Sequence, residues 1–407
     1  MGNTPNIRFK GFTDDWEQRK LNEVAEFNPK SELPDEFEYV DLESVVGTEM
    51  ISHRTETKDS APSRAQRLAQ PGDVFFQTVR PYQKNNYLFS KLDNNYVFST
   101  GYAQMRPNID TAFLMSFLQT DSFVKIVLDN CTGTSYPAIN SSDLSNLEIS
   151  LPKSFEEQKK VGKTIISIDN LITLHQRKCD ETKKLKKFML QKMFPKKDAK
   201  KPEIRFAGFT NDWEQRKLGE IVERVTRKNQ DLVSELPLTI SAQYGLIDQN
   251  EFFDKRVASK DVSGYYLIYN GEFAYNKSTS SDAPWGAIKR LDRYENGVLS
   301  TLYIVFRIKN EDILNSDFLM NYYDTNNWHK DIQAIASEGA RNHGLLNIAP
   351  ADFFETELML PQDIEEQKNI GNYFKSLNNL ITLHQRKCDE LKEFKKYMLQ
   401  NMFPQKG

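Results

Sequence analysis

The sequence has few cysteines and no long apolar run. Its three cysteines, Cys131, Cys179 and Cys388, are too few to hold 407 residues together with disulfides. No segment approaches the roughly 18 consecutive apolar residues of a membrane-spanning helix. Near the start, charged residues such as Arg8 and Lys10 interrupt the apolar stretch that a secretory signal peptide requires. We therefore expect a soluble protein of the reducing cytoplasm that does not associate with a membrane.

Catalytic signatures are also missing. The sequence contains no GxxxxGK[ST] phosphate loop and no GxSxG nucleophile elbow. It has no Asp/Asn-Pro-Pro-aromatic run of the kind that marks adenine methyltransferases, because Asn28-Pro29-Lys30 does not fit that pattern. Acidic residues are abundant, but none lies in a nuclease-like Asp…Glu-x-Lys frame. We therefore expect the chain itself to be non-catalytic.

The net charge of −3 conceals a strong segregation of charge along the chain. Residues 22–151 carry 10 basic and 18 acidic side chains, a net of −8, and residues 219–360 carry 14 and 21, a net of −7. Residues 152–202 carry 15 basic and 6 acidic side chains, a net of +9. The bulk charge of the two acidic segments argues against nonspecific binding of polyanions, so any nucleic-acid contact there has to come from local basic clusters.

Two blocks of the sequence occur twice. Ile7–Leu21 reads IRFKGFTDDWEQRKL, and Ile204–Leu218 reads IRFAGFTNDWEQRKL. The twelve residues NLITLHQRKCDE occupy Asn170–Glu181 and return unchanged at Asn379–Glu390. The sequences between these blocks have diverged almost completely. The chain is therefore an internal duplication in which the flanking segments of the two copies are nearly identical and the segments between them differ.

Matching residues keep their order through the divergent parts as well. The offset between the copies rises in small steps from 197 at Trp16 and Trp213 to 209 at Pro152 and Pro361. Insertions into a common ancestor produce such a steady rise. We therefore predict that residues 22–151 and 219–360 share one fold and present different surfaces.

Each divergent segment shows a mixed pattern of secondary structure. Short β-rich runs such as Asp73–Val79 alternate with turn residues, and a helical pattern follows, as at Ala112–Leu128. Each segment ends in an apolar strand that stops at Pro152 or Pro361. We predict the α+β class, with two pseudo-symmetric α+β domains.

A long helical pattern follows each of these prolines. Glu156–Phe194 contains no proline and only Gly162 as a weak helix former, which predicts a helix about 58 Å long. After Cys179 we expect its apolar face to shift toward Leu185 and Met189. Up to that point, seam residues recur at steps of 4, 3, 4, 3 and 4 in both copies: Val161, Ile165, Ile168, Ile172, His175 and Cys179, then Ile370, Phe374, Leu377, Ile381, His384 and Cys388. This period of 3.5 predicts that the two helices bury their seams against each other in a coiled coil.

Two interpretations of the histidines and cysteines in the seam remain open. His175 and Cys179, like His384 and Cys388, are four residues apart and share one helix face. If the helices met there, two cysteines and two histidines could bind Zn²⁺ tetrahedrally. Alternatively they fill seam positions, with the imidazoles hydrogen-bonded between the helices. We favour this second interpretation and expect no metal, because antiparallel helices need not bring both pairs level.

Two windows of positive charge lie within the acidic segments. Residues 54–90 and 255–290 each carry a local charge of +3 and contain loops rich in amide, hydroxyl and aromatic groups. Arg and Lys can contact guanine, Asn and Gln can pair with adenine, and Ser and Thr can hold phosphates. A polar solvated loop is the alternative for any single residue. The candidate DNA-binding residues are Arg54, Arg64, Arg67, Gln77, Arg80, Lys84, Asn85 and Asn86, then Lys255, Arg256, Asn276, Lys277, Ser278, Thr279, Ser280 and Trp285.

A second loop in each copy precedes the final strand and contains a glycine, Gly133 or Gly339. Glycine permits a close approach of the backbone, and its neighbours can hydrogen-bond a base or a phosphate. A simple turn before a buried strand is the alternative. The candidates in these loops are Thr134, Ser135 and Tyr136, then Arg341, Asn342 and His343.

The repeated motifs together resemble one known family. They are RFxGFxxxWExxxL at Arg8–Leu21 and Arg205–Leu218, and PxxxEEQ followed by LITLHQRKCDE and MLQxMFP in both copies. The chain is similar, over essentially its whole length, to the specificity subunit of type I restriction–modification systems. The resemblance implies two target-recognition domains, each of which reads one half of a split, asymmetric site in double-stranded DNA.

The same resemblance implies partners and a division of the chain. The two helices would form an antiparallel coiled coil that fixes the half-site spacing and docks two methyltransferase subunits. Restriction subunits would then join, and S-adenosylmethionine, ATP and Mg²⁺ would act in these partners, with no cofactor in this chain. The implied segments are a conserved start at 1–21, target-recognition domain 1 at 22–151, a long helix at 152–195, a linker at 196–202, a repeated conserved segment at 203–218, target-recognition domain 2 at 219–360, and a second long helix at 361–407.

Two other functions are compatible with parts of this pattern. The chain could be a coiled-coil adaptor whose tandem domains bind proteins, or a DNA-processing enzyme with an unrecognised active site. The acidic divergent segments also fit poorly with tight DNA binding by the chain alone. We therefore expect the partner methyltransferases to supply much of the affinity for phosphates.

Overall fold

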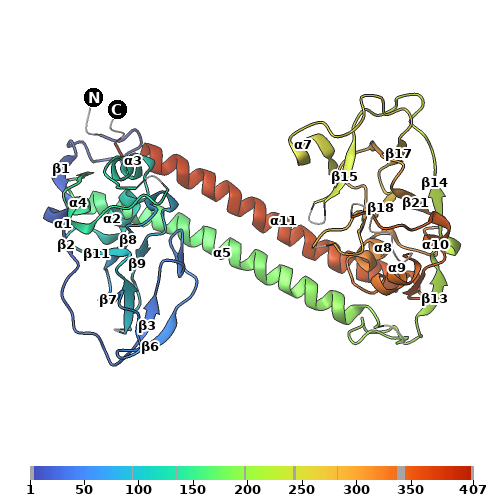
Figure 1. Ribbon diagram of the computed structural model, residues 1–407, viewed down its shortest axis with the longest axis horizontal. Coiled ribbons are helices and arrows are strands. Elements are labelled where there is room, and N and C mark those ends of the chain that lie inside the picture. The colour runs from blue at the N-terminus through green and yellow to red at the C-terminus, as the bar shows by residue number, and fades with distance from the viewer. Residues whose placement is uncertain are drawn as a thin grey trace. The chain divides into compact units, whose positions relative to one another are not determined.

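The chain divides into two compact units, each described by itself. Unit 1 is Met1–Cys179 with Leu383–Gly407, and unit 2 is Asp180–Thr382. The computed structural model (Figure 1) describes residues 4–93, 95–133, 135–196, 199–241, 244–281, 283–336 and 344–404.

Two long helices dominate the secondary structure. Helix α5 spans Phe155–Met193, 39 residues, and α11 spans Ile364–Asn401, 38 residues. Each carries two glutamates in its first turn, where they complement the positive end of the helix dipole. Unit 1 contains the first part of α5 and the last part of α11, and unit 2 contains the remainder of both.

The seam predicted for these helices is confirmed. Its twelve members are buried at Val161, Ile165, Ile168, Cys179, Ile370, Phe374, Leu377 and Cys388, and half-buried at Ile172, His175, Ile381 and His384. The expected shift of the seam toward Leu185 is wrong, because Leu185 is 44% exposed. The heptad steps continue past Cys179 without a shift and end at the buried Met193.

The two helices run antiparallel within unit 1. Asp169 of α5 pairs with Lys395 of α11 at 2.6 Å, and His175 Nδ1 lies 3.0 Å from His384 Nδ1. Residue numbers therefore rise along one helix where they fall along the other.

A polar layer surrounds the histidine pair. The Cys179 thiol lies 3.8 Å from Gln385 Oε1, and the Cys388 thiol lies 3.6 Å from Gln176 Oε1. The interhelical hydrogen bond expected of the imidazoles is confirmed. The described residues contain no group of three or more His, Cys, Asp or Glu side chains that could hold a metal ion.

Unit 1 contains two four-stranded sheets and a pairing of the repeated first segment with the last strand of the divergent segment. Strand β1 (Glu17–Lys20) pairs antiparallel with β12 (Glu148–Leu151). The first sheet has the order β2-β11-β8-β9, formed by Ala25–Phe27, Tyr102–Pro107, Val74–Gln77 and Tyr87–Leu88. The second has the order β6-β3-β10-β7, formed by Arg54–Thr57, Glu36–Val40, Tyr96–Ser99 and Ala65–Leu68. A small hairpin joins β4 (Val45–Val46) to β5 (Glu49–Met50).

Unit 2 repeats the first sheet and the conserved pairing. Strand β13 (Glu214–Lys217) pairs with β22 (Glu357–Leu360). The four-stranded sheet has the order β14-β21-β18-β19, formed by Val222–Val225, Ile304–Ile308, Phe273–Asn276 and Ala287–Arg290. Two pairs take the place of the second sheet, β15-β16 and β17-β20, linked by a single parallel bridge between Pro237 and Val298; their strands are Leu238–Ser241, Gly245–Asp248, Tyr266–Tyr269 and Asn296–Leu299. The predicted common α+β fold is therefore present, with its divergence in the second sheet.

Short helices cover the sheets. In unit 1 they are α1 (Leu21–Val24), η1 (Pro81–Gln83), α2 (Thr111–Leu118), α3 (Asp121–Asp129) and α4 (Ser141–Ser145). In unit 2 they are α6 (Leu218–Ile221), α7 (Gln249–Phe253), α8 (Ser316–Tyr323), α9 (His329–Ile335) and α10 (Pro350–Phe354). The predicted single helical pattern at Ala112–Leu128 is split, since α2 ends at Leu118 and Thr120 caps the start of α3.

No single described helix is long and apolar enough to cross a bilayer. The pair α2 and α3, bent by 66°, meets that test of length and composition only when taken together, and its apolar side chains lie in the core of unit 1.

The repeated sequence motifs meet in the core of each unit. In unit 1 the Arg8 guanidinium donates to both carboxylate oxygens of Glu157 at 2.7 and 2.9 Å, and Trp16 Nε1 donates to the same carboxylate at 3.3 Å. Phe403, from the MFP motif after α11, packs edge-on against Trp16 at 6.0 Å between ring centroids.

Unit 2 repeats this arrangement with its own residues. Arg205 donates to both oxygens of Glu366 at 2.6 and 2.7 Å, and Trp213 Nε1 donates to Glu366 at 3.3 Å. Phe194, from the MFP motif after α5, packs edge-on against Trp213 at 6.1 Å. The motifs are alike in both copies because they contact one another.

The glycine in each long helix permits a close approach of a second helix. A Cβ on Gly162 would lie 2.3 Å from the backbone nitrogen of Phe113, in the first turn of α2, and 2.8 Å from the side chain of Asp110, which caps that helix. A Cβ on Gly371 would lie 2.8 Å from Asp317 Cβ in α8. Both glycines therefore set how the divergent domain packs on the long helix.

Replacement of Gly162 by alanine should destabilise unit 1. The added methyl group meets backbone atoms, which cannot rotate away, so the overpacking should cost about 1–3 kcal/mol despite the better helix propensity of alanine. Urea unfolding followed by circular dichroism measures the loss. The matched control is Lys163→Ala on the exposed neighbouring position, which should leave stability nearly unchanged. Equal stability of the two variants would contradict this packing argument.

Candidate nucleic-acid interface

The two candidate loops of unit 1 are joined by backbone hydrogen bonds. Ile139 N donates to Thr78 O at 3.0 Å, and Arg80 N donates to Pro137 O at 2.8 Å. Val79 and Ala138 form the bridge between these bonds. The loop after β8 is therefore fixed to the loop before α4. We name this pair of backbone hydrogen bonds, with the two loops that it joins, the loop clamp.

Unit 2 contains the same loop clamp. Leu346 N donates to Lys277 O at 3.0 Å, and Thr279 N donates to Gly344 O at 2.7 Å. Ser278 and Leu345 form the intervening bridge. The donors of the second bond, Arg80 and Thr279, are 199 residues apart. The strands that precede them match at the same offset, so the two residues occupy equivalent positions. The backbone frame is conserved although its side chains differ.

Backbone strain is concentrated in the first loop of unit 1. Arg80 and Lys84 flank η1 and both have left-handed backbone conformations, with φ of 54° and 56°. Such conformations are costly for residues with a Cβ, and Pro81 restricts Arg80 further. The Arg80 guanidinium lies over the ring of Tyr136, 4.4 Å from its centroid. Tyr136 is 63% exposed, so this stacked pair faces solvent.

Two other candidates of this loop hold it in place. Lys84 Nζ donates to Gln119 O at 2.9 Å and to the Asp121 carboxylate, and this hydrogen bond lowers the pKa of Asp121. Asn85 Oδ1 accepts from Gly47 N at 2.8 Å. Lys84 and Asn85 therefore join the loop to neighbouring elements.

Gln77 and Asn86 are buried beneath the loop and hydrogen-bond to it. They are 2% and 1% exposed, and Asn86 Oδ1 accepts from Gln77 N at 2.9 Å. Gln77 Nε2 donates to Val79 O at 2.6 Å and to Gln83 Oε1 at 2.9 Å. Gln77 Oε1 and Asn86 Nδ2 are buried without a hydrogen-bond partner among the described residues. Both side chains are too buried to reach a duplex in this conformation.

The three remaining arginines of the first window lie on or next to the edge strands of the second sheet. Arg54 is on the edge strand β6 and pairs with Asp41 at 2.9 Å and Glu56 at 2.7 Å. Arg67 is on the opposite edge strand β7, where burial lowers the pKa of its guanidinium. Arg64 is exposed just before that strand. Within the described residues, no side-chain hydrogen bond or ion pair joins these arginines to the loop clamp.

In unit 2 the candidates at the loop clamp are Asn276 to Ser280. Asn276 Oδ1 accepts from Ser278 N at 3.0 Å, and Thr279 Oγ1 donates to Gly344 O at 3.0 Å. Lys277 Nζ donates to Ile348 O at 3.3 Å, and burial lowers the pKa of this ammonium. Ser280 and Ala283 exchange backbone hydrogen bonds at 3.1 and 3.2 Å, which closes a tight turn.

The other candidates of unit 2 lie apart from these bonds. Trp285 is half-buried and packs against the core, and its carbonyl accepts from the Tyr275 hydroxyl at 2.8 Å. Lys255 and Arg256 are exposed after α7, where Arg256 donates to Ser259 O at 2.9 Å within its own loop.

Four predicted residues, Thr134, Arg341, Asn342 and His343, lie outside the described residues. Ser135, next to the stacked Tyr136, is exposed.

Sequence patterns do not mark two of the acceptors of the loop clamp. Pro137 in unit 1 and Gly344 in unit 2 contribute backbone carbonyls, so no side-chain pattern marks them. Pro137 and Gly344 are 207 residues apart, an offset between the 199 of Arg80 and Thr279 and the 209 of Pro152 and Pro361. This offset was the only feature of the sequence that marked them as equivalent.

A second apolar stripe on each long helix was also missed. It lies on the outer surface and comprises Leu171, Leu174, Leu185 and Phe188 on α5, then Leu380, Leu383, Phe394 and Tyr397 on α11, all 44–53% exposed. The steps are 3, 11 and 3 on both helices, which places the stripe about 110° around the helix from the seam. We name these residues the outer stripe.

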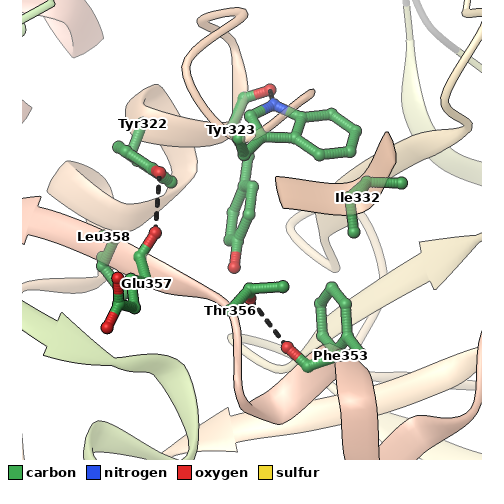
Figure 2. A pocket seen from close by; sticks show the side chains of 8 residues that line it. Tyr322, Tyr323, Ile332, Phe353, Thr356, Glu357 and Leu358 are labelled. Atoms are coloured by element: carbon green, nitrogen blue, oxygen red, sulfur yellow. Dashed lines mark hydrogen bonds between the residues drawn. The ribbon is translucent and has the colours of Figure 1, made fainter. Parts of the chain in front are cut away.

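Figure 2 shows a small hollow in unit 2 between α8, α9, α10 and β22. Tyr322, Tyr323 and Phe353 contribute its aromatic lining, and burial raises the pKa of Tyr323 well above its ordinary value. Its space of about 10 Å³ accommodates a water molecule and is far too small for an extruded base.

Residues 13–184 and 210–393 match the family model described as type I restriction modification DNA specificity domain. Two curated relatives are the specificity subunits of the type I restriction enzymes HindI of Haemophilus influenzae and MjaVIII of Methanocaldococcus jannaschii. The first is 24% identical over 40% of this chain and 37% of its own length, and the second is 34% identical over 28% and 27%. The matched stretches therefore span about a third of those relatives.

Solved structures share the fold of the chain. The type I restriction-modification S subunit from M. genitalium aligns over 99% of this chain and 100% of its own, with a TM-score of 0.65 and 15% identity. A chain from a structure of type I R-M complex assembly covers 95% and 97%, with a TM-score of 0.50 and 22% identity. Because the family model matches most of the sequence in two copies, the chain belongs to the family of type I restriction–modification DNA specificity domains.

Proposed function

We propose that this chain is the DNA sequence-specificity subunit of a cytoplasmic type I restriction–modification complex. Residues 22–151 and 219–360 are its target-recognition domains, and each reads one half of a bipartite, asymmetric site in double-stranded DNA. The observation that carries the proposal is the loop clamp, which has the same backbone hydrogen bonds in both units and different side chains. A non-palindromic site has two different half-sites, so it requires two domains that share a backbone fold and present different side chains.

The contacts of the candidate residues divide them into two groups. The side chains that face solvent at the loop clamp, Arg80, Ser135, Tyr136, Ser278 and Ser280, are positioned to contact DNA. Gln77, Lys84, Asn85 and Asn86 act by fixing the loop that carries Arg80. Thr134, Arg341, Asn342 and His343 remain candidates on their sequence positions alone.

The charge distribution of the chain indicates that partner subunits provide part of the affinity for DNA phosphates. Both divergent segments are acidic, and Arg54 and Lys84, two of the cations in the first window, are paired with acids of their own unit. Since phosphate neutralisation provides most of the nonspecific affinity for DNA, this chain alone should bind DNA weakly at physiological salt. The methyltransferase subunits would supply phosphate contacts, and S-adenosylmethionine, ATP and Mg²⁺ would act in the partners.

The outer stripe supports the docking of two methyltransferase subunits. Apolar side chains that share one helix face, here in two pairs with a step of 3 within each pair, form a surface for another helix, and the seam is already occupied. Four residues recur at matching positions on α5 and α11, so one chain offers the same surface twice. Duplicated surfaces bind two copies of one partner. Restriction subunits would join the complex after the methyltransferases.

Removal of the outer stripe from one helix should cost one partner. In Leu171→Ser/Leu174→Ser, two exposed apolar side chains are lost without any change in the seam, so the subunit should still fold. Mass photometry of the complex should show one bound methyltransferase in place of two. The control is Lys184→Ser, on an exposed position of α5 outside the outer stripe, which should bind two. Two bound copies on the leucine variant would exclude the outer stripe as the docking surface.

Replacement of residues 22–151 by the matching domain of a relative tests the function itself. One half of the methylated DNA sequence should change and the other should stay, because each domain reads its own half. Single-molecule sequencing of N6-methyladenine in a host that carries the complex measures both halves at once.

The same exchange separates the alternatives. A coiled-coil adaptor would lose a partner without altering any DNA motif, and a DNA-processing enzyme would retain turnover as an isolated chain. Either result would refute the specificity function.

A further inference from the structure

Arg80 and Thr279 occupy the same position in the two loop clamps. Each lies 199 residues from its counterpart, and each donates its backbone N–H across the loop clamp, to Pro137 O at 2.8 Å or Gly344 O at 2.7 Å. The position is thus defined by backbone geometry that does not depend on the side chain. A long cation stands there in unit 1 and a short hydroxyl in unit 2.

The donors of Arg80 are available to a ligand. No carboxylate or carbonyl accepts a hydrogen bond from its guanidinium within the described residues, unlike Arg54, which pairs with Asp41 and Glu56. The central carbon of the guanidinium lies over the Tyr136 ring, 4.4 Å from its centroid, a distance at which the ring face attracts the cation. The side chain is therefore held against the ring, and its fork of donors has no acceptor within the described residues.

The backbone beneath Arg80 is also held in place. Its left-handed conformation, φ 54° and ψ 55°, is costly before a proline and persists only where surrounding bonds enforce it. The loop clamp and the bond from Gln83 N to Arg80 O at 3.0 Å supply that enforcement. A planar donor pair on a fixed backbone loses little entropy when it binds a planar acceptor pair.

The acceptor that fits this arrangement is the edge of a guanine. Guanine offers O6 and N7 side by side in the major groove, and a bidentate arginine is the most common specific contact to it. A phosphate also accepts from arginine, but the phosphates of both half-sites are alike, so a phosphate contact gives no reason for the two copies to differ at this position. Arginine stands there in unit 1 and threonine in unit 2, as expected of a residue that reads a base.

Thr279 offers different chemistry. Its hydroxyl hydrogen is used in the bond to Gly344 O at 3.0 Å, so toward a ligand the side chain presents oxygen lone pairs and a methyl group. Such a group cannot donate to guanine O6 or N7.

We propose that Arg80 reads one guanine in the major groove of the half-site bound by unit 1, and that unit 2 makes no guanine contact from the equivalent Thr279. This inference rests on the proposed function and adds the identity of one base. It makes Arg80 a specificity-determining residue, with Tyr136 as the residue that orients it.

The test uses the subunit in complex with its methyltransferases. Wild type, Arg80→Gln and Arg80→Lys are incubated with a library of random duplex DNA, and N6-methyladenine is located by single-molecule sequencing. In Arg80→Gln the preference for guanine at one position of the half-site read by unit 1 should fall by about 5- to 150-fold. Arg80→Lys keeps the charge and a donor but loses the fork, so its preference should fall less, and it keeps the test decisive if the glutamine variant does not fold. All other positions should be unchanged.

A matched control removes the same charge elsewhere. Lys125→Gln alters an exposed residue of α3, outside both loops of the loop clamp, and should leave the motif intact. Relaxation of the same position by this variant would show a general charge effect and overturn the inference. An unchanged motif in the Arg80 variants, or an equal loss of methylation on every sequence, would also overturn it, the latter because it is the signature of a phosphate contact.

The exchange of residues 22–151 distinguishes this failure from failure of the proposed function. If that exchange changes one half-site and the Arg80 variants change none, the guanine contact is wrong and the specificity function stands. If neither alters the methylated sequence, the proposed function fails as well.

Discussion

The frame of each unit depends on one buried carboxylate at the start of a long helix. Glu157 is 1% exposed and accepts hydrogen bonds from Arg8 and Trp16, and Glu366 does the same with Arg205 and Trp213. Removal of one partner from a buried ion pair costs about 3–5 kcal/mol, because the other charge is left without compensation. The conserved segment before each divergent domain therefore has to meet the helix after it. The tryptophan extends this contact to the end of the other long helix through Phe403 or Phe194.

A frame fixed in this way allows the reading surface to change. The loop clamp uses only main-chain donors and acceptors, which every residue except proline supplies in full. Arg80 can therefore stand where Thr279 stands without loss of a structural bond. The neighbouring supports differ as well, since Lys84 binds the Gln119 carbonyl in unit 1 and Lys277 binds the Ile348 carbonyl in unit 2. At this position the divergence of sequence therefore leaves the backbone hydrogen bonds of the loop clamp unchanged.

The parts of the structure that the sequence predicted are those set by local periodicity and by repetition. The heptad steps identified the seam, and the one error, Leu185, came from assuming a change of phase where the same steps continued to Met193. The repeated motifs predicted a shared fold, and the order of the first sheet is the same in both units. The reduction of the central pairing of the second sheet in unit 2 to one bridge, between Pro237 and Val298, had no local signal. The roles of Lys84 and Asn85 also depend on partners 35 and 38 residues away, which residue type cannot reveal.

The polar layer in the seam has a consequence for the proposed spacing of half-sites. A slide of one heptad would place His175 against Leu377 or Leu391 and separate each cysteine thiol from the glutamine that it now meets. An unpaired polar group in a seam costs stability, so the layer selects one register, as single buried polar residues do in other coiled coils. Seven residues correspond to about 10 Å along a helix, or about three base pairs of duplex. A purely apolar seam would allow a slide of one heptad. Such a slide is incompatible with the proposed fixed spacing between half-sites, so the polar layer serves that spacing.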